Sequence, residues 1–476
     1  MNGKIKTALA IILAASAAAT VLTACTNTKK TPDFPENAVS YVSDYKKLSD
    51  YSLNGTVKFK KGESFELDFG KDVTFDTVSL YEKGDNCREF SIYIQKEGGD
   101  WELAYKQDRI MAYHLCYLGE VTACKMRIEI TDSVNDVALR EVCVYQAEKV
   151  DKKLKVTQYL RFDAQDFSEL IGDEGFSGYY DVVTDPIIFG AVYLDENANV
   201  CFYKGEEHFA SQLENLRKII GDRNVNIRCC IFFDQYGEDR AKGLDNTKDF
   251  VNNNIDKINE NIKAFVEKYG IYGIDYDWEY PTKSAQWKAY DLIITQTAKY
   301  TKVSVAVPPW QIKLGKSARE CVEIVNVMAY DLFDELNDHS NYYNAGYEVI
   351  RKVRAFGFKD EQIAVGIPTY ARTVDRSEYA WPTVREDGKD LGKWGKIVKD
   401  YEYTDKDTNE IKHSDGYLNS YAEVRDKTAT AIDENIGGVM IFRAFCDSEY
   451  TDEYCRTRAI GEVIDERSSS AAADNN

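Results

Sequence analysis

The run 273–281 carries an acid at every second position, namely Asp275, Asp277 and Glu279. Alternate side chains of a β-strand point to the same face. If this run is a strand, three carboxylates share one face and the large apolar residues between them share the other. This spacing constrains the fold and the chemistry of the chain more than any other feature of the sequence.

Alternating acids also occur on the solvated face of an antiparallel strand. Here the residues between the acids are large and apolar, Gly273 precedes them, and a helical pattern at 250–269 comes before the run. That order is typical of a strand in a barrel or a parallel sheet, which is buried on both faces. Burying three carboxylates costs free energy, which suggests that they are kept for a functional role. Crowding separates their pKa values, so that one can donate a proton at neutral pH.

The composition limits the class of protein. The chain has 476 residues, enough for two or three domains, with 44% hydrophobic and 13% aromatic residues. The formal net charge of −20 argues against binding to a nucleic-acid backbone and favours a neutral or cationic ligand.

The first 25 residues predict a targeting segment. Lys4 and Lys6 precede an apolar stretch at 8–21, and Leu22-Thr23-Ala24-Cys25 follows. This arrangement resembles a bacterial lipoprotein signal, which implies cleavage before Cys25 and lipidation of that cysteine. The alternative is an ordinary secretory signal. We expect a tether at 26–49 and an extracytoplasmic protein, at the bacterial cell membrane or surface, that contacts the membrane only through the lipid.

Ten cysteines follow Cys25 without a paired Cys-x-x-Cys, and the four histidines are scattered. We therefore expect no metal site and no cofactor. Cys116 with Cys124, and Cys446 with Cys455, are candidate local disulfides in an exported protein.

Residues 50–148 contain short alternating strands and turn signals, which predict a β-sandwich. The segments 66–70, 90–94, 99–101 and 126–128 resemble those of discoidin-like (coagulation factor 5/8 type C) modules. That resemblance implies a jelly-roll, galactose-binding-like domain, a type that often binds carbohydrate. The alternative is a spacer that holds the next domain away from the membrane.

Three aromatic residues of this module, Tyr113, His114 and Tyr117, lie in a predicted loop. They suit either sugar binding or packing.

From residue 156 the pattern changes to strands that alternate with helices. Apolar strands are expected at 155–159, 186–193, 226–233, 273–279, 303–307, 324–330, 364–367 and 438–442. Eight strand–helix units over 156–465 predict a (β/α)8 TIM barrel, followed by a disordered tail at 466–476. An open doubly wound sheet is the alternative, although no Gly-rich phosphate turn follows the first strand.

In a TIM barrel the catalytic groups lie at the C-terminal ends of the strands. Residues 269–281 resemble the strand-four signature of glycoside hydrolase family 18. The segments 303–309, 327–331, 365–372 and 437–441 resemble strands five to eight of that family, in the same order. The resemblance spans residues 156–462.

The resemblance implies substrate-assisted retaining catalysis on a 2-acetamido sugar. Glu279 is then the general acid, Asp277 orients the acetamide group, and Asp275 shares a proton with Asp277. Tyr330 is expected to donate to the acetamide oxygen and Asp331 to bind sugar hydroxyls.

Further residues are expected to bind the substrate, and the sequence leaves alternatives for several of them. The expected set is Met328, Tyr370, Arg372, Trp310 and Phe442. Met328 and Tyr330 could instead be barrel core, Arg372 could form a surface ion pair, and Trp310 could cap the barrel.

Four departures from the family pattern concern substrate choice. Tyr272 replaces the first acid of the longer strand-four pattern, and 230–234 lacks the usual Ser-x-Gly-Gly. Phe442 stands where a tryptophan usually forms the floor. The interval from Arg372 to Gly437 is short, so that any inserted domain is small and the cleft is shallower.

The sequence therefore predicts a monomeric glycosidase that cleaves β-1,4 bonds of N-acetylglucosamine-containing glycans such as chitin. One alternative is an endo-β-N-acetylglucosaminidase acting on N-glycans or peptidoglycan fragments. Another is a glycan-binding surface lipoprotein without catalysis, although Glu279 is retained.

Overall fold

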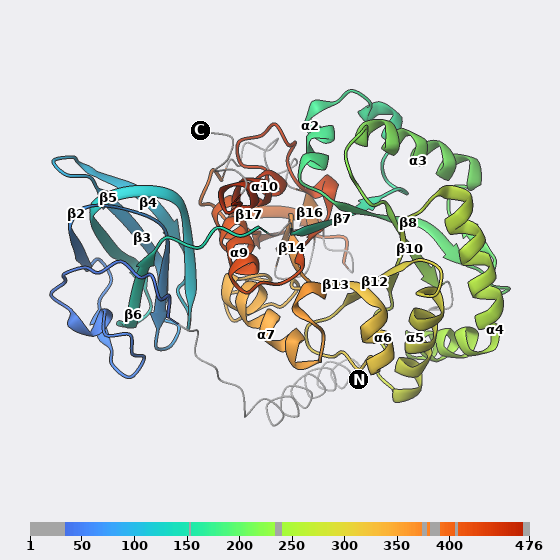
Figure 1. Ribbon diagram of the computed structural model, residues 1–476, viewed down its shortest axis with the longest axis horizontal. Helices are drawn as coiled ribbons and strands as arrows, with labels where there is room; N and C mark the ends of the chain where they lie inside the picture. The colour runs from blue at the N-terminus through green and yellow to red at the C-terminus, as the bar shows by residue number, and fades with distance from the viewer. Residues whose placement is uncertain are drawn as a thin grey trace.

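The computed structural model describes residues 34–151, 154–233, 240–373, 378–380, 391–404 and 408–469. These residues form an antiparallel β unit and a larger α/β unit that lie side by side (Figure 1). The predicted signal segment, Cys25 and the start of the predicted tether lie outside the described residues.

The N-terminal unit is built from antiparallel strands in the order β1-β6-β2-β5-β3-β4. The strands are β1 (Val57–Phe59), β2 (Ser64–Glu82), β3 (Cys87–Gln95), β4 (Trp101–Gln107), β5 (His114–Ser133) and β6 (Val137–Tyr145). The register of β2 against β5 shifts between Asp68 and Val73 and again between Phe75 and Thr77. Such irregularities bend long strands, which is compatible with the predicted β-sandwich.

The described part of the predicted tether is packed rather than free. Leu48 is fully buried, Val42 pairs with Asp68, and the Val39 N–H donates to Val144 O at 2.7 Å. Apolar side chains in this segment find buried positions against the sandwich. The sandwich therefore begins earlier than the predicted boundary at residue 50.

The second unit is a closed barrel of eight parallel strands, as the alternating pattern predicted. The strands are β7 (Lys155–Arg161), β8 (Asp185–Leu194), β10 (Arg228–Phe233), β11 (Gly273–Asp277), β12 (Lys302–Val307), β13 (Val322–Val327), β14 (Ile363–Pro368) and β19 (Gly438–Phe442). Each pairs with the next, β19 pairs with β7, and the β8–β10 pairing closes the ring. A short strand, β9 (Val200–Phe202), lies antiparallel to β8.

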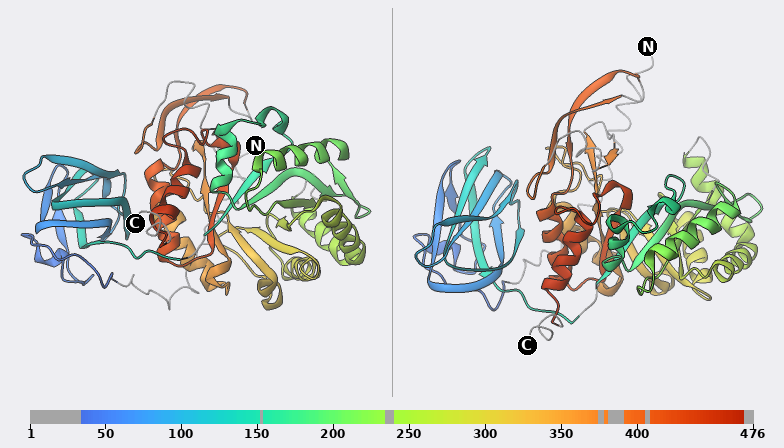
Figure 2. Two further views of the ribbon diagram at one scale, coloured as in Figure 1. Left: turned by 45° about the horizontal axis from the view of Figure 1, so that its top comes forward. Right: turned by 90° about the horizontal axis from the view of Figure 1, so that it is seen from above.

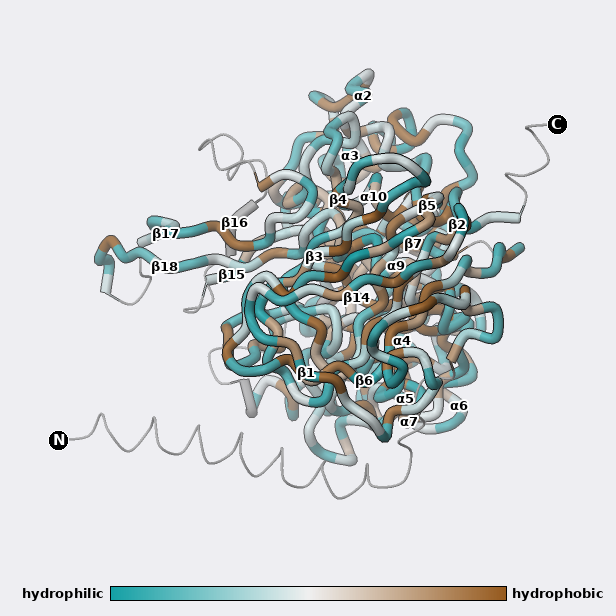
Figure 3. Tube along the Cα trace, turned by 90° about the vertical axis from the view of Figure 1, so that its left-hand side faces the viewer, coloured by the Kyte–Doolittle hydropathy of each residue, from teal (hydrophilic) through white to brown (hydrophobic). Residues whose placement is uncertain are grey.

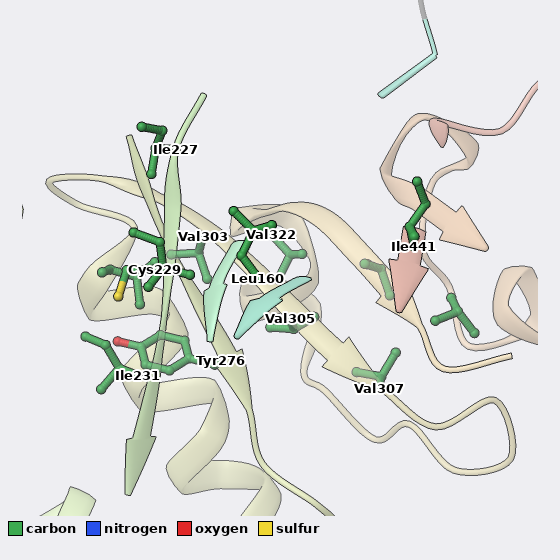
Figure 4. Packing of buried hydrophobic residues seen from close by; sticks show 14 of the residues in the cluster. Leu160, Ile227, Cys229, Ile231, Tyr276, Val303, Val305, Val307, Val322 and Ile441 are labelled. Atoms are coloured by element: carbon green, nitrogen blue, oxygen red, sulfur yellow. The ribbon is translucent and has the colours of Figure 1, made fainter. Parts of the chain in front are cut away.

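Helices cover the outside of the barrel. They are α2 (Glu174–Ser177), α3 (Glu206–Ile220), α4 (Arg240–Tyr269), α5 (Ser284–Thr297), α6 (Lys316–Cys321), α7 (Glu348–Ala355), α9 (Tyr421–Asp433) and α10 (Arg456–Glu466). Outward residues of neighbouring strands, such as Ile231 and Tyr276, pack together beneath them (Figure 4). Because alternate residues of each strand serve this outer core, the remaining ones point into the barrel.

A small antiparallel sheet is inserted between β14 and α9. It consists of β15 (Tyr370–Thr373), β16 (Glu378–Ala380), β17 (Ile397–Thr404) and β18 (Ile411–Tyr417), in the order β16-β15-β18-β17. The β17–β18 hairpin projects from the barrel (Figures 2 and 3).

Helix α9 faces the sandwich (Figure 1), and every residue from Tyr421 to Ile432 is buried. His114 stacks on Tyr342 with ring centroids 4.3 Å apart, and Tyr113 lies 4.6 Å from Tyr347. The Tyr117 N–H donates to Asp426 at 2.8 Å. The three aromatic residues considered for sugar binding therefore belong to the interface between the two units.

Two smaller predictions are wrong. All ten cysteines after Cys25 are free thiols, so neither candidate disulfide forms. The chain is ordered beyond 466, because Arg467 is only 1% exposed and donates to Glu148 O at 3.1 Å, which shortens the predicted tail. No helix of the described residues has the length and apolar character to cross a bilayer.

Candidate active site

Strand β11 brings the alternating acids to the C-terminal mouth of the barrel. Asp275 and Asp277 lie within the strand, and Glu279 follows its end. A cavity of about 260 Å³ opens above them. Its lining includes these predicted residues: Asp277, Glu279, Trp310, Met328, Tyr330, Asp331, Tyr370, Arg372 and Phe442.

Asp275 lies beneath this cavity and is fully buried. Its carboxylate accepts hydrogen bonds from Tyr159 at 2.9 Å, Ser304 at 2.6 Å and Asn326 at 3.3 Å. Burial raises the pKa of Asp275 above its ordinary value, although these hydrogen bonds oppose the shift. None of these three donors is predicted by the pattern of the sequence. A signal was available for Ser304 and Asn326, because each is a polar residue with apolar neighbours on both sides in its strand.

Asp277 is 9% exposed, and its buried Oδ1 receives no hydrogen bond from the described residues. Burial, then the charge of Glu279, then that of Asp275 raise the pKa of Asp277 well above its ordinary value. The group therefore combines an unused acceptor with a strong tendency to hold a proton, which is the behaviour expected of a functional carboxyl.

Phe442 is the centre of an aromatic cluster at the floor of the cavity. The ring of Tyr330 stacks on it with centroids 5.6 Å apart. The rings of Tyr159 and Tyr370 meet it edge to face, with centroid distances of 5.7 and 6.0 Å. Tyr330 is 8% exposed, and burial followed by the charges of Asp277 and Glu279 raises the pKa of its hydroxyl. Phe442 thus supplies an apolar face beside a Tyr330 hydroxyl that stays protonated.

Asp331 joins the cavity to the loop that follows β13. Tyr370 donates to its carboxylate at 3.1 Å, and Arg372 Nε lies 3.2 Å away. Partial burial opposes ionisation, but the interaction with the His339 ring and the charge of Arg372 prevail and lower the pKa of Asp331. Arg372 therefore forms its ion pair inside the cavity. His339 is fully buried, and nothing in the linear pattern of the sequence places it beside Asp331.

Trp310 is 46% exposed and meets Tyr280 edge to face at 5.6 Å. An exposed indole at the edge of the cavity fits a side wall of a binding site better than a buried cap of the barrel.

Two of the departures from the family pattern lie below the mouth of the barrel. Tyr272 precedes β11, and its ring lies 5.0 Å from the guanidinium of the buried Arg228. It therefore belongs to the opposite end of the barrel from Glu279. Cys230 of β10 begins the segment that lacks the Ser-x-Gly-Gly of the family, and it is paired in register with Asp275. Residues 234–239 lie outside the described residues.

A second hollow, of about 560 Å³, has a lining that includes Asp173, Phe176 and Phe445 and is larger than the cavity above β11. We place the active site in the smaller cavity because it contains the carboxyl groups with shifted pKa values. Nowhere in the described chain do three or more His, Cys, Asp or Glu side chains come together as metal ligands.

A closed (β/α)8 barrel with paired acids and an aromatic floor at its C-terminal mouth defines a glycosidase-type site. Comparison with known families agrees, because the profile of "Glycosyl hydrolases family 18" matches residues 186–447, more than half of the chain. The chain belongs to this family.

Individual relatives are distant. Chitinase 1 of Aphanocladium album is 23% identical over 240 residues, which are 41% of this chain and 56% of that protein. The chain thus spans only about half the length of this curated relative.

Solved structures show the same fold. The family 18 chitinase ChiB from the chitin utilization locus of Flavobacterium johnsoniae has a TM-score of 0.51 at 20% identity, over 66% of this chain and 95% of that one. A chitinase from Bacteroides thetaiotaomicron has a TM-score of 0.52 at 16% identity, over 66% and 97%. A class V chitinase from Nicotiana tobaccum, in complex with NAG4, has a TM-score of 0.51 at 12% identity, over 66% and 99%.

Proposed function

We propose that the protein hydrolyses β-1,4 bonds of N-acetylglucosamine-containing glycans, with chitin or chitooligosaccharides as substrates, by substrate-assisted retaining catalysis. The observation that carries this proposal is the state of the carboxyl groups. Asp277 has an unused buried acceptor next to Glu279. The third carboxylate that lines the described cavity, Asp331, is engaged by Arg372 and Tyr370. A free carboxylate nucleophile is therefore lacking among the described cavity residues, and the substrate's own acetamide can take that role.

In the proposed reaction Glu279 protonates the glycosidic oxygen as the bond to the anomeric carbon breaks. The acetamide carbonyl oxygen of the same sugar attacks that carbon and forms a cyclic oxazolinium ion. Asp277 accepts the acetamide N–H through its free Oδ1, and Tyr330 donates to the acetamide oxygen. Glu279 then takes a proton from water, which opens the ring, so that the product keeps the β-configuration.

The buried partners of Asp275 have a role in this scheme. Because Tyr159, Ser304 and Asn326 fix the carboxyl of Asp275, a proton shared between Asp275 and Asp277 can move without rearranging the barrel. As Asp277 turns toward the acetamide, Asp275 retains the proton and Asp277 carries the charge that faces the oxazolinium ion.

The named relatives are chitinases, which favours chitin over N-glycans and peptidoglycan fragments. The test compares wild type with Glu279→Gln on chitooligosaccharides, a glycoprotein and a muropeptide. We expect wild type to release oligosaccharides from the first substrate and Glu279→Gln to lose at least about a thousandfold in rate. Proton NMR of the first product should show the β-anomer.

Other outcomes separate the alternatives. Cleavage of the glycoprotein or the muropeptide alone would reassign the substrate. Binding of oligosaccharides by wild type without any hydrolysis would identify a glycan-binding protein. Hydrolysis that survives Glu279→Gln would refute the assignment of the acid.

We also propose that the protein is exported and anchored by a lipid on Cys25, on the strength of the sequence Leu22-Thr23-Ala24-Cys25 after an apolar segment. Metabolic labelling with an alkyne fatty acid should mark the wild-type protein and leave Cys25→Ser unlabelled. Equal labelling of both would contradict the anchor.

A further inference from the structure

The loop 331–341, which follows β13, carries Asp331 of the active site and is folded back on itself. The Leu332 N–H donates to His339 O at 2.9 Å, and the Asp331 N–H reaches His339 Nδ1 at 3.4 Å. His339 Nδ1 also lies 3.3 Å from the Asp331 carboxylate. Asp331 has a φ of 58°, a left-handed conformation that a non-glycine residue keeps only when its surroundings enforce it.

Asp334 organises the outer half of this loop. Its carboxylate accepts hydrogen bonds from the Leu336 N–H at 2.8 Å, the Asp338 N–H at 3.1 Å and Asn341 Nδ2 at 2.9 Å. The side chain is only 5% exposed, so its charge needs a cation close by.

That cation comes from the sandwich. Arg109, which follows β4 and is 3% exposed, forms ion pairs with Asp334 and with Asp85 of its own domain. It also lies 3.2 Å from Glu335. One guanidinium therefore joins the sandwich to the loop through two carboxylates, which the planar fork of arginine suits.

A second cation reaches the same loop from the inserted sheet region. Lys396, which is 4% exposed, lies 2.8 Å from a carboxylate oxygen of Asp338 and 2.9 Å from one of Glu423. It also lies 3.4 Å from Asp108 of the sandwich. Asp338 directly precedes His339, which contacts Asp331. Lys396 therefore holds the residue next to the partner of Asp331.

We propose that Arg109 of the sandwich is a positioning residue of the active site, and that Lys396 supports it. Together they hold the loop 331–341 in the conformation that presents Asp331 to the sugar and keeps His339 buried beside it. The sandwich is then part of the catalytic unit rather than an independent appendage. This inference deepens the proposed function and rests on it.

The test uses the full chain and two measurements. Hydrogen exchange of peptides from 331–341 reports the loop without any substrate. Titration of tetra-N-acetylchitotetraose into the Glu279→Gln background reports the sugar site without turnover. In Arg109→Met we expect faster exchange in the loop and about tenfold weaker sugar binding, while Arg109→Lys restores part of both.

Arg467→Met is the matched control. Arg467 is also a buried arginine at the interface, where it pairs with Asp433 and donates to Glu148 O, but it does not contact the loop. We expect it to lower stability and to leave loop exchange and sugar affinity unchanged. If Arg109→Met does not fold, Arg109→Met combined with Asp334→Asn removes the uncompensated buried charge and takes its place. It is compared with Asp334→Asn alone, because Asp334 also holds the loop through its own hydrogen bonds.

Each result is decisive. Unchanged exchange in the loop, or an equal change in Arg467→Met, overturns the inference. A loosened loop with unaltered sugar affinity reduces Arg109 to a purely structural role and overturns it as well. If the Glu279→Gln parent binds no oligosaccharide and wild type cleaves none, the proposed function fails, and the exchange data still decide whether Arg109 holds the loop.

Discussion

The barrel interior and the interface between the two units both bury carboxyl groups. The groups at the interface are paired with cations, whereas those in the barrel are not. At the interface Asp334 faces Arg109 and Asp338 faces Lys396. In the barrel Asp275 has only neutral donors, and one oxygen of Asp277 has no protein partner among the described residues.

The pKa shifts of Asp277 and Asp338 follow this difference, whereas burial and the charge of Asp338 raise the pKa of Asp334 in spite of Arg109. Burial raises the pKa of Asp277, and the charges of its acidic neighbours raise it further. Asp338 is equally buried, yet the charge of Lys396 outweighs burial and lowers its pKa. The pairing of Asp338 therefore fits a structural role, whereas the unused acceptor and raised pKa of Asp277 fit a functional one.

The largest effect should come from removing a cation at the interface. Lys396→Met leaves Asp338 and Glu423 buried with less compensation, and we expect a loss of about 3–5 kcal/mol in the free energy of unfolding. Urea denaturation followed by circular dichroism measures it. A loss below about 1 kcal/mol would show that the interface does not depend on this charge.

The same type of change in the barrel should act on catalysis instead. Asp277→Asn keeps the shape but cannot carry the negative charge, so we expect a fall in kcat of about a hundredfold to a thousandfold. Thermal unfolding should show an equal or higher melting temperature, because a costly buried acid is gone. A clear loss of stability would mean that Asp277 is a structural acid like Asp338.

The pH dependence of stability should differ in sign between the two regions. Because folding raises the pKa of Asp277, this group favours the folded state at low pH, and that contribution is lost as pH rises from about 3.9 through the folded pKa. Asp338, with a lowered pKa, contributes above about 3.9 and loses its contribution as pH falls through the folded value.

Melting curves between pH 3 and pH 8 should therefore show that the melting temperature of Asp277→Asn rises relative to that of wild type as pH rises. Asp338→Asn should approach wild type as pH falls. Parallel curves for either variant would contradict the corresponding shift.

The smallest effect should come from the floor of the site. Phe442→Leu removes the aromatic face while keeping an apolar side chain, and we expect about a twofold to tenfold loss of oligosaccharide affinity. Calorimetric titration in the Glu279→Gln background measures it. Leu160→Val, which alters the outer core of the barrel, serves as the control and should leave affinity unchanged.

The candidate site was largely predictable because its main residues lie on one strand or follow strand ends. A period of two fixes the shared face of Asp275 and Asp277, and strand order fixes which loops meet at the mouth. The residues that were missed, such as Tyr159, Ser304 and Asn326, act across strands, and their pairing depends on the register of the closed barrel.

The sequence alone predicted the alternation of strands and helices and the shared face of the acids, because these follow from local periodicity, and it left an open sheet as the alternative to a barrel. Closure of the barrel was decided by the pairing of β8 with β10. Only the tertiary structure decided that the sandwich contacts the active-site loop, since Arg109 and Asp334 are 225 positions apart in the chain. It also turned His114 from a candidate sugar ligand into an interface residue stacked on Tyr342. Contacts between distant segments depend on how folded surfaces match, and no local pattern records that match.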